Sequence, residues 1–217
     1  MKKLLTAAAI LGLIACGEGQ ADDENDLSAQ VVGLIVDISG ADERRVPQSA
    51  VTEEEILSSP GEYLRVNIRD IERRDTMQQI GSNGTRTTWV DTANISLALQ
   101  NGVVVATRGL IRDLMGADVG QTVRALRAGG GQAERRHDFL DDQDQIVTVV
   151  LNCEITRKDR EQVNRLGQSL MAQRYEEVCV SDGLSLTNVY WIAGSGRVVR
   201  SLQAVSPDAG YLQIDAF

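Results

Sequence analysis

The stretch ISLALQNGVVVAT (residues 95–107) places the dipeptide Asn101-Gly102 between two apolar runs. Asparagine and glycine both tolerate positive φ, and this dipeptide between apolar strands is the strongest short-range signal for a β-hairpin. Residues 64–68 alternate apolar and polar side chains, as a half-buried strand does. These two patterns predict that antiparallel strands are the main element of the fold.

Further extended runs are predicted at residues 133–140, 145–156, 168–180, 186–192, 197–205 and 211–217. No long helical pattern lies between consecutive strands, so parallel βαβ units are not expected. A capping box at Thr52–Glu55 and the apolar spacing of residues 27–38 predict helices near the N-terminus. We therefore expect a mainly β fold, either an antiparallel β-sandwich or a partly closed barrel, with a short helical N-terminal segment.

The first sixteen residues, MKKLLTAAAILGLIAC, have the form of a bacterial lipoprotein signal. Two lysines precede a short apolar run, and small Ala15 precedes Cys16. The run is shorter than the roughly 20 residues that a membrane-spanning helix needs. We predict cleavage after residue 15 and lipidation of Cys16; the alternative is an ordinary secretory signal followed by a chance cysteine.

Three segments follow from this assignment. Residues 1–15 are the signal peptide, residues 16–26 are an acidic flexible tether, and residues 27–217 form a single mainly β domain. Residues 95–109 and 187–202 share a strand, glycine turn, strand and arginine, so the domain could contain two related β-hairpin halves.

The charge of the chain bears on its partners. The sequence has 22 basic and 31 acidic residues, and loss of Lys2 and Lys3 with the signal changes the formal net charge from −9 to −11. An acidic protein repels phosphate backbones, so nucleic-acid binding is not expected. The lipid is then the membrane anchor, and Gly17 after the lipidated cysteine favours the outer membrane, with the domain facing the periplasm.

Cys153 and Cys179 are the two cysteines that remain after Cys16. An even pair in an oxidising periplasm predicts a disulfide, although two free buried thiols are the alternative. A metal site is not expected, because the chain has one histidine and no CxxC motif.

Catalytic residues and cofactors are not predicted. His137, the only histidine, lies in the charged run Glu134–Asp138, where we expect a solvated strand residue without the partner that a general base needs. Gly194-Ser195-Gly196 lacks the full G-x-S-x-G spacing of a nucleophile elbow.

Five residues are candidates for a binding surface. Arg108, Arg112 and Asp113 lie in one turn-rich stretch beside apolar residues. They could bind a sugar or a partner protein, or they could pin an irregular loop by charge-assisted hydrogen bonds. Trp89 and Trp191 could stack on sugar rings, or they could anchor the strands that carry them in the core.

Several of these stretches together resemble a known family, the YjbF-type lipoproteins related to the group 4 capsule lipoprotein GfcB. The resemblance rests on the lipobox and on residues 88–91 (TWVD), residues 97–115 (LALQNGVVVATRGLIRDLM), Cys153, Cys179, residues 188–191 (NVYW) and residues 205–212 (VSPDAGYL). It covers most of the chain from about residue 60 onward.

The resemblance implies a mainly β outer-membrane lipoprotein of exopolysaccharide or capsule production and export. It also implies companions, namely a periplasmic partner and an outer-membrane β-barrel, and it supplies no catalytic residue. We expect a non-enzymatic accessory factor that acts through contacts with proteins or weak contacts with polysaccharide. The main alternative is a periplasmic β-scaffold that carries a lipid or a glycan.

Overall fold

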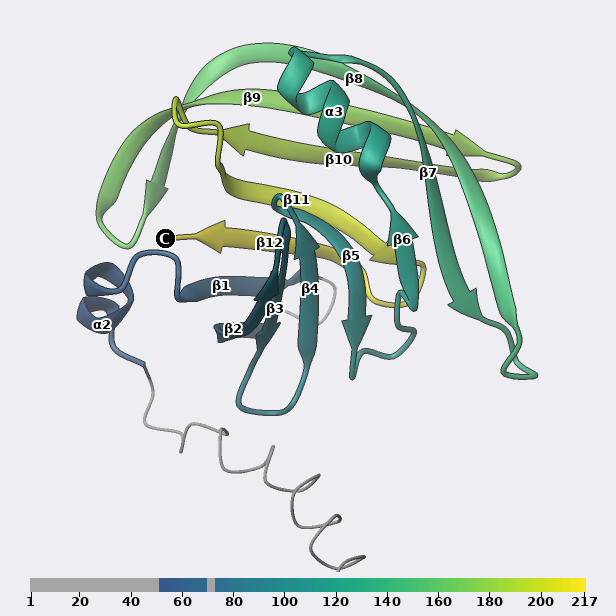
Figure 1. Cartoon of the computed structure of the whole chain (residues 1–217), viewed down its shortest axis with the longest axis horizontal. Helices are drawn as coiled ribbons and strands as arrows, with labels where there is room; N and C mark the ends of the chain where they lie inside the picture. Colours follow the sequence, from purple (N-terminus) through teal and green to yellow (C-terminus); the bar gives the residue numbers. More distant parts are fainter. Residues whose placement is uncertain (1–50, 70–72) are drawn as a thin grey trace, which may run out of the picture. The chain divides into compact units, whose positions relative to one another are not determined.

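Twelve antiparallel strands form one sheet in the part of the chain that the computed structural model describes, residues 51–69 and 73–217 (Figure 1). The mainly β prediction is confirmed, and the sheet is a nearly closed barrel rather than a sandwich. The elements are α2 (Glu53–Ser58), β1 (Tyr63–Ile68), β2 (Arg73–Asn83), β3 (Arg86–Val90), β4 (Ser96–Gln100), β5 (Val103–Arg108), β6 (Gly116–Asp118), α3 (Gly120–Ala128), β7 (Gly131–Leu140), β8 (Ile146–Arg165), β9 (Gln168–Ser181), β10 (Leu184–Ile192), β11 (Val198–Ser206) and β12 (Gly210–Ala216).

In the middle of the sheet β1 pairs with β12, the last strand, while every other pair of neighbours is consecutive in the chain. The strand order is β5-β4-β3-β2-β1-β12-β11-β10-β9-β8-β7-β6, which leaves β5 and β6 at the two edges. Residues 109–115 join these edges, and the backbone amide of Thr107 donates to the carbonyl of Leu114 across the gap (3.0 Å). The sheet therefore has only a short open seam, which limits unpaired strand edges.

Consecutive antiparallel strands place their turns alternately at the two ends of the barrel. We call end A the end with the β5–β6, β7–β8, β9–β10 and β11–β12 connections, and end B the end with the β2–β3, β4–β5, β8–β9 and β10–β11 turns. At end B, Ile56 of α2 packs with Tyr63 and Phe217. Thr52 and Glu55 form the predicted capping box of α2.

Helix α3 lies within the curve of β7 to β10 and packs on β7 and β8 (Figure 1). Its residues Thr122, Val123, Ala125 and Leu126 are buried, and Gly129 ends the helix in the left-handed conformation at φ 92°. The sequence patterns did not predict this helix. Its nine residues carry few apolar side chains, so the surrounding barrel supplies most of the stabilisation that keeps it helical.

The hairpin predicted from Asn101-Gly102 is present as β4 and β5. Asn101 and Gly102 both have positive φ (51° and 85°), as the dipeptide predicts. Gly102 also lies against β11, since a Cβ atom at this position would be 2.6 Å from the Cβ of Val198. The amide of Gln203 reaches the same turn, donating to the carbonyl of Gly102 and accepting from the amide of Val104 (2.9 Å each).

Cys153 and Cys179 are directly opposite each other in the β8–β9 pairing, and a disulfide joins them inside the barrel. The predicted signal peptide, Cys16, the tether at 16–26 and the helix at 27–38 lie outside the described residues. The described residues fall within one compact unit, and none of their helices is long and apolar enough to span a membrane. The two similar stretches, 95–109 and 187–202, correspond to the β4–β5 and β10–β11 hairpins, and their common origin stays a prediction.

We predict that Gly102→Ala lowers the free energy of unfolding by about 2–4 kcal/mol, because it adds a clash with Val198 to the strain of positive φ. Gly84→Ala is the matched control, since Gly84 also has positive φ (58°) but no atom within 4 Å of the added Cβ. That control should cost only about 1 kcal/mol. Urea unfolding of both variants measures the difference, and equal losses would contradict the close approach of the turn to β11.

Candidate functional site

The interior of the barrel contains a buried carboxylate, Glu177 on β9, that accepts hydrogen bonds from four side chains. Arg135 Nη1 (2.7 Å), Tyr190 Oη (2.8 Å) and Asn188 Nδ2 (2.8 Å) donate to Oε2, and Thr122 Oγ1 (2.6 Å) donates to Oε1. Neither side chain of the Arg135–Glu177 ion pair has more than 1% of its surface exposed. We call these five residues the central network.

Arg135 and Glu177 both remain charged within the central network. Burial alone would raise the pKa of Glu177, but the charge of Arg135 and the hydrogen bonds from Thr122, Asn188 and Tyr190 hold that pKa below its ordinary value. Burial opposes the charge on Arg135, yet Glu177 and Tyr190 raise its pKa above the ordinary value. Burial and the adjacent carboxylate raise the pKa of Tyr190 well above 10. A carboxylate saturated with donors in this way suits structural pairing better than proton transfer.

Sequence reasoning missed the central network, although β-strand periodicity carried a signal for it. Cys179 was expected to be buried in a disulfide, and Glu177 lies two residues before it on the same face of β9. Similarly, Arg135 alternates with buried Ala133 on β7. Alternation alone did not predict that Arg135 and Glu177 are buried, because charged side chains are expected at the surface. The two residues are partners, but they lie 42 residues apart in the sequence.

The expectation that His137 is a solvated residue is wrong. Its side chain faces inward, only 3% of the residue is exposed, and its ring packs edge-on against Phe139 (6.0 Å between centroids). Burial, helped by the charge of Arg135, lowers its pKa to about 3, so the imidazole is neutral at pH 7. Its Nε2 has no hydrogen-bond partner among the described residues.

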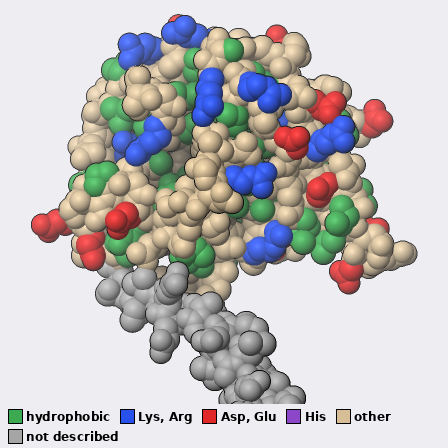
Figure 2. Space-filling view, in the orientation of Figure 1, with side chains coloured by type: hydrophobic (Ala, Val, Ile, Leu, Met, Phe, Trp, Pro, Cys, Tyr) green, Lys and Arg blue, Asp and Glu red, His purple; other side chains and the backbone are tan. Residues whose placement is uncertain are grey.

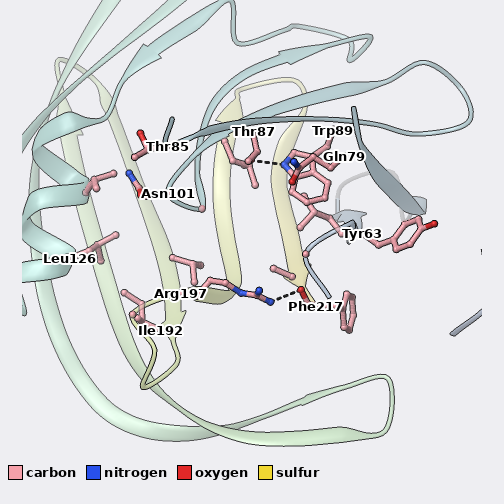
Figure 3. A pocket seen from close by; sticks show the side chains of 18 of the residues that line it. Tyr63, Gln79, Thr85, Thr87, Trp89, Asn101, Leu126, Ile192, Arg197 and Phe217 are labelled. Carbon is pink, nitrogen blue, oxygen red and sulfur yellow. Dashed lines mark hydrogen bonds between the residues drawn. The ribbon is translucent and has the colours of Figure 1, made fainter. Parts of the chain in front are cut away.

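A cavity of about 320 Å³ opens at end B, between the strand ends and α3 (Figure 3). Trp89 lies in its wall, as Figure 3 shows, but only 5% of the residue is exposed. Its indole N–H donates to Thr87 Oγ1 (2.8 Å). Trp89 therefore anchors the core of β3 and presents little ring surface for stacking on a sugar.

A second cavity, of about 570 Å³, opens at end A. Its lining comes from β7, β8, β10, β11 and β12 and from the turns at that end, and His137 belongs to it. Both cavities fall in the range of roughly 300–1,000 Å³ that is typical of sites for small molecules.

Arg108 and Asp113 pin the loop between β5 and β6. The carboxylate of Asp113 accepts from Thr107 Oγ1 and from the amides of Gly109 and Leu110, at 2.9–3.1 Å. The guanidinium of Arg108 donates to the carbonyls of Thr107, Leu114 and Met115. Of the two alternatives left by the sequence, loop pinning accounts for these two residues.

Arg112 has a different environment at the rim of the end-A cavity. Its Nε lies 3.1 Å from Asp208 Oδ2, and its Nη2 lies 3.9 Å from Asp142 Oδ1. The side chain thereby links the β5–β6 loop with two other turns at end A, and almost half of its surface is exposed. It is the one charged candidate that remains available to a ligand.

Trp191 lies apart from the other candidates. Its indole N–H donates to Glu161 Oε2 (2.8 Å) in the distal half of β8, and its ring joins a small cluster around Val163, Ala172 and Val199. In Figure 1 the β8–β9 hairpin curls toward the C-terminus. The structure therefore distributes the five sequence candidates over three places instead of bringing them together.

The surface charge of the domain is uneven. On the face that Figure 2 shows, Lys and Arg side chains spread over the centre, while most Asp and Glu side chains lie toward the margins. The formal net charge of −9 therefore does not describe every face of the molecule.

We predict that Glu177→Gln lowers the free energy of unfolding by about 3–5 kcal/mol, because it leaves the buried guanidinium of Arg135 without its counter-charge. The matched control is Glu176→Gln, which changes the neighbouring, more exposed carboxylate paired with Lys158. That variant should lose no more than about 1 kcal/mol. Urea unfolding near pH 7 measures both, and similar losses would contradict a structural role that is special to Glu177.

We also predict a loss of stability in acid that depends on His137. Its pKa is lower in the folded protein than in the unfolded chain, so its contribution is present above pH 6.5 and is lost as the pH falls toward 3. Between pH 7 and pH 5 the loss should be about 2 kcal/mol, and His137→Gln should remove it. Unfolding at both pH values measures this effect, and an equal pH dependence in the variant would contradict it.

Comparison with known proteins identifies relatives of this chain. The family described as "Group 4 capsule polysaccharide lipoprotein gfcB, YjbF" matches residues 26–217. The crystal structure of the hypothetical lipoprotein YmcC from Escherichia coli K12 is similar in fold, with a TM-score of 0.68, 18% sequence identity, and coverage of 77% of this chain and 88% of that chain. No curated protein sequence matches at a significant level. Because the family match spans most of the sequence, this chain belongs to the YjbF/GfcB family of group 4 capsule polysaccharide lipoproteins.

Proposed function

We propose that this chain is a lipid-anchored accessory factor of the outer membrane that supports capsule or exopolysaccharide production and export without catalysing a reaction. The observation that carries the proposal is the match of residues 26–217 to a family named for the group 4 capsule polysaccharide lipoprotein. Cys16 would carry the lipid, and the domain would face the periplasm. Its partners would be other export proteins, namely a periplasmic protein and an outer-membrane β-barrel.

The barrel has properties that suit such a role. Glu177 is tied up in the central network, which leaves it unsuited to acid–base chemistry. The disulfide joins the neighbouring strands β8 and β9, and the buried ion pair joins β7 to β9 across β8, so the surface loops are presented by a rigid scaffold. A scaffold of this kind can act through contacts with proteins, or through weak contacts with polysaccharide.

The alternative, a scaffold that carries a lipid or a glycan, is supported by the cavities at the two ends. For a glycan the support is weaker, because Trp89 is almost fully buried in the wall of the end-B cavity. For a lipid it is stronger, because the end-A cavity is larger and its walls are mostly apolar.

Deletion and complementation test the accessory role. We predict that deletion lowers the amount of secreted polysaccharide, and that the wild-type protein restores it while Cys16→Ser does not, because that variant lacks the anchor. Secreted polymer is quantified in each strain, and immunoblots of membrane and soluble fractions show that both proteins are made and where they reside. Unchanged secretion after deletion would contradict the proposed role, and full rescue by Cys16→Ser would contradict the need for an anchor.

A further inference from the structure

The end-A cavity deepens from an open mouth to a closed floor. Along β8 the inward-facing side chains change from Val147, which is 45% exposed, through Val149 to Leu151, which is 1% exposed. Leu184 and Leu186 of β10 follow the same gradient on the other side. The cavity therefore runs along the barrel from end A toward the central network.

The walls and floor of this cavity suit an apolar ligand. The inward-facing side chains of β7, β8 and β10 in its walls are mostly aliphatic or aromatic. His137 stands at the floor as a neutral ring, so it places no charge there. A volume of about 570 Å³ within such walls has the size and chemistry that a single acyl chain requires.

Apolar side chains are exposed at the mouth of this cavity. Val147 and Leu184, which line the mouth, are 45% and 36% exposed, and Ile111, the neighbour of Arg112 in the β5–β6 loop, is 78% exposed. A single exposed isoleucine is ordinary. Large apolar side chains beside the mouth of an apolar cavity, however, give the tail of an amphiphile a continuous path from a membrane surface into the barrel.

The charges at the rim indicate the kind of head group. The guanidinium of Arg112 can pair with a phosphate, and the carboxylates of Asp142 and Asp208 flank it. Asp142 is almost fully exposed and Asp208 about half exposed, so both can reach an ammonium group at the mouth. A zwitterionic head group would match both signs of charge, whereas a purely anionic one would face two carboxylates.

We propose that the end-A cavity binds one acyl chain of a zwitterionic membrane phospholipid, with the tail between β7, β8 and β10 and the head group at Arg112, Asp142 and Asp208. This lipid site goes beyond the accessory role in export and does not depend on it. It specifies the lipid-carrying alternative by naming the cavity, the ligand and the orientation in which the ligand enters.

The test uses the full secreted chain carrying Cys16→Ser, so that its own predicted anchor lipid does not compete. A neutral dye that fluoresces in apolar surroundings, N-phenyl-1-naphthylamine, reports occupancy. It is displaced with 1-palmitoyl lysophosphatidylethanolamine or with the anionic 1-palmitoyl lysophosphatidylglycerol, each below its micelle concentration. We expect the dye to bind at one site, and the zwitterionic lipid to displace it at a concentration about tenfold lower than the anionic lipid.

Two cavity variants and one control locate the site. Val149→Trp fills the middle of the cavity, and Val147→Trp narrows its exposed mouth, where an added ring is tolerated more easily. Val150→Trp is the control, because Val150 is the neighbouring residue on β8 and lies outside the lining of the cavity. Both cavity variants should weaken dye binding by about tenfold or more, while the control should leave it unchanged.

The remaining outcomes would overturn the proposal. Absence of dye binding, or equal binding by Val147→Trp, Val149→Trp and Val150→Trp, would show that the cavity is not the site. Dye that binds in the cavity but is not displaced by either lysophospholipid would overturn the assignment of a phospholipid as the ligand. Stronger displacement by the anionic lipid would overturn the zwitterionic assignment. None of these results depends on the export phenotype of the deletion strain.

Discussion

A single buried carboxylate on β9 connects helix α3 with strands β7 and β10 of this barrel. Glu177 of β9 accepts from Thr122 of α3, Arg135 of β7, and Asn188 and Tyr190 of β10. A buried charge is tolerated only when it is paired and hydrogen-bonded, so these elements must come together for any of them to be stable. The same requirement holds the buried face of α3 against the sheet, since Thr122 on that face donates to Glu177.

The central network also divides the interior into two ends with different properties. At end B, α3, the C-terminal strand and several turns surround a smaller cavity that includes Trp89. At end A the strands extend beyond the network, and their inward faces line a larger and mostly apolar cavity. An accessory role in export and a lipid site at end A are compatible, because partner proteins would contact the outside of the barrel and an acyl chain would occupy its inside.

The candidate residues show how far local sequence patterns lead. Arg108 and Asp113 were recognised as a dense charged group, and they do interact with the loop that contains them. Arg112, from the same stretch, lies instead at the rim of a cavity built by distant strands. The difference arises because Asp113 and Arg108 satisfy backbone groups within a few residues, whereas Arg112 meets Asp142 and Asp208 from other turns.

The sequence by itself determined the local elements. Asn101-Gly102 specified a hairpin, Thr52 and Glu55 specified a helix start, and alternating side chains specified antiparallel strands, because each of these signals acts between near neighbours. Only the tertiary structure decided that Arg135, His137 and Glu177 face inward, that β1 pairs with β12, and that end A contains a cavity. Those features depend on partners tens of residues away in the sequence. A charged side chain is expected to be exposed unless the buried residue that pairs with it is known.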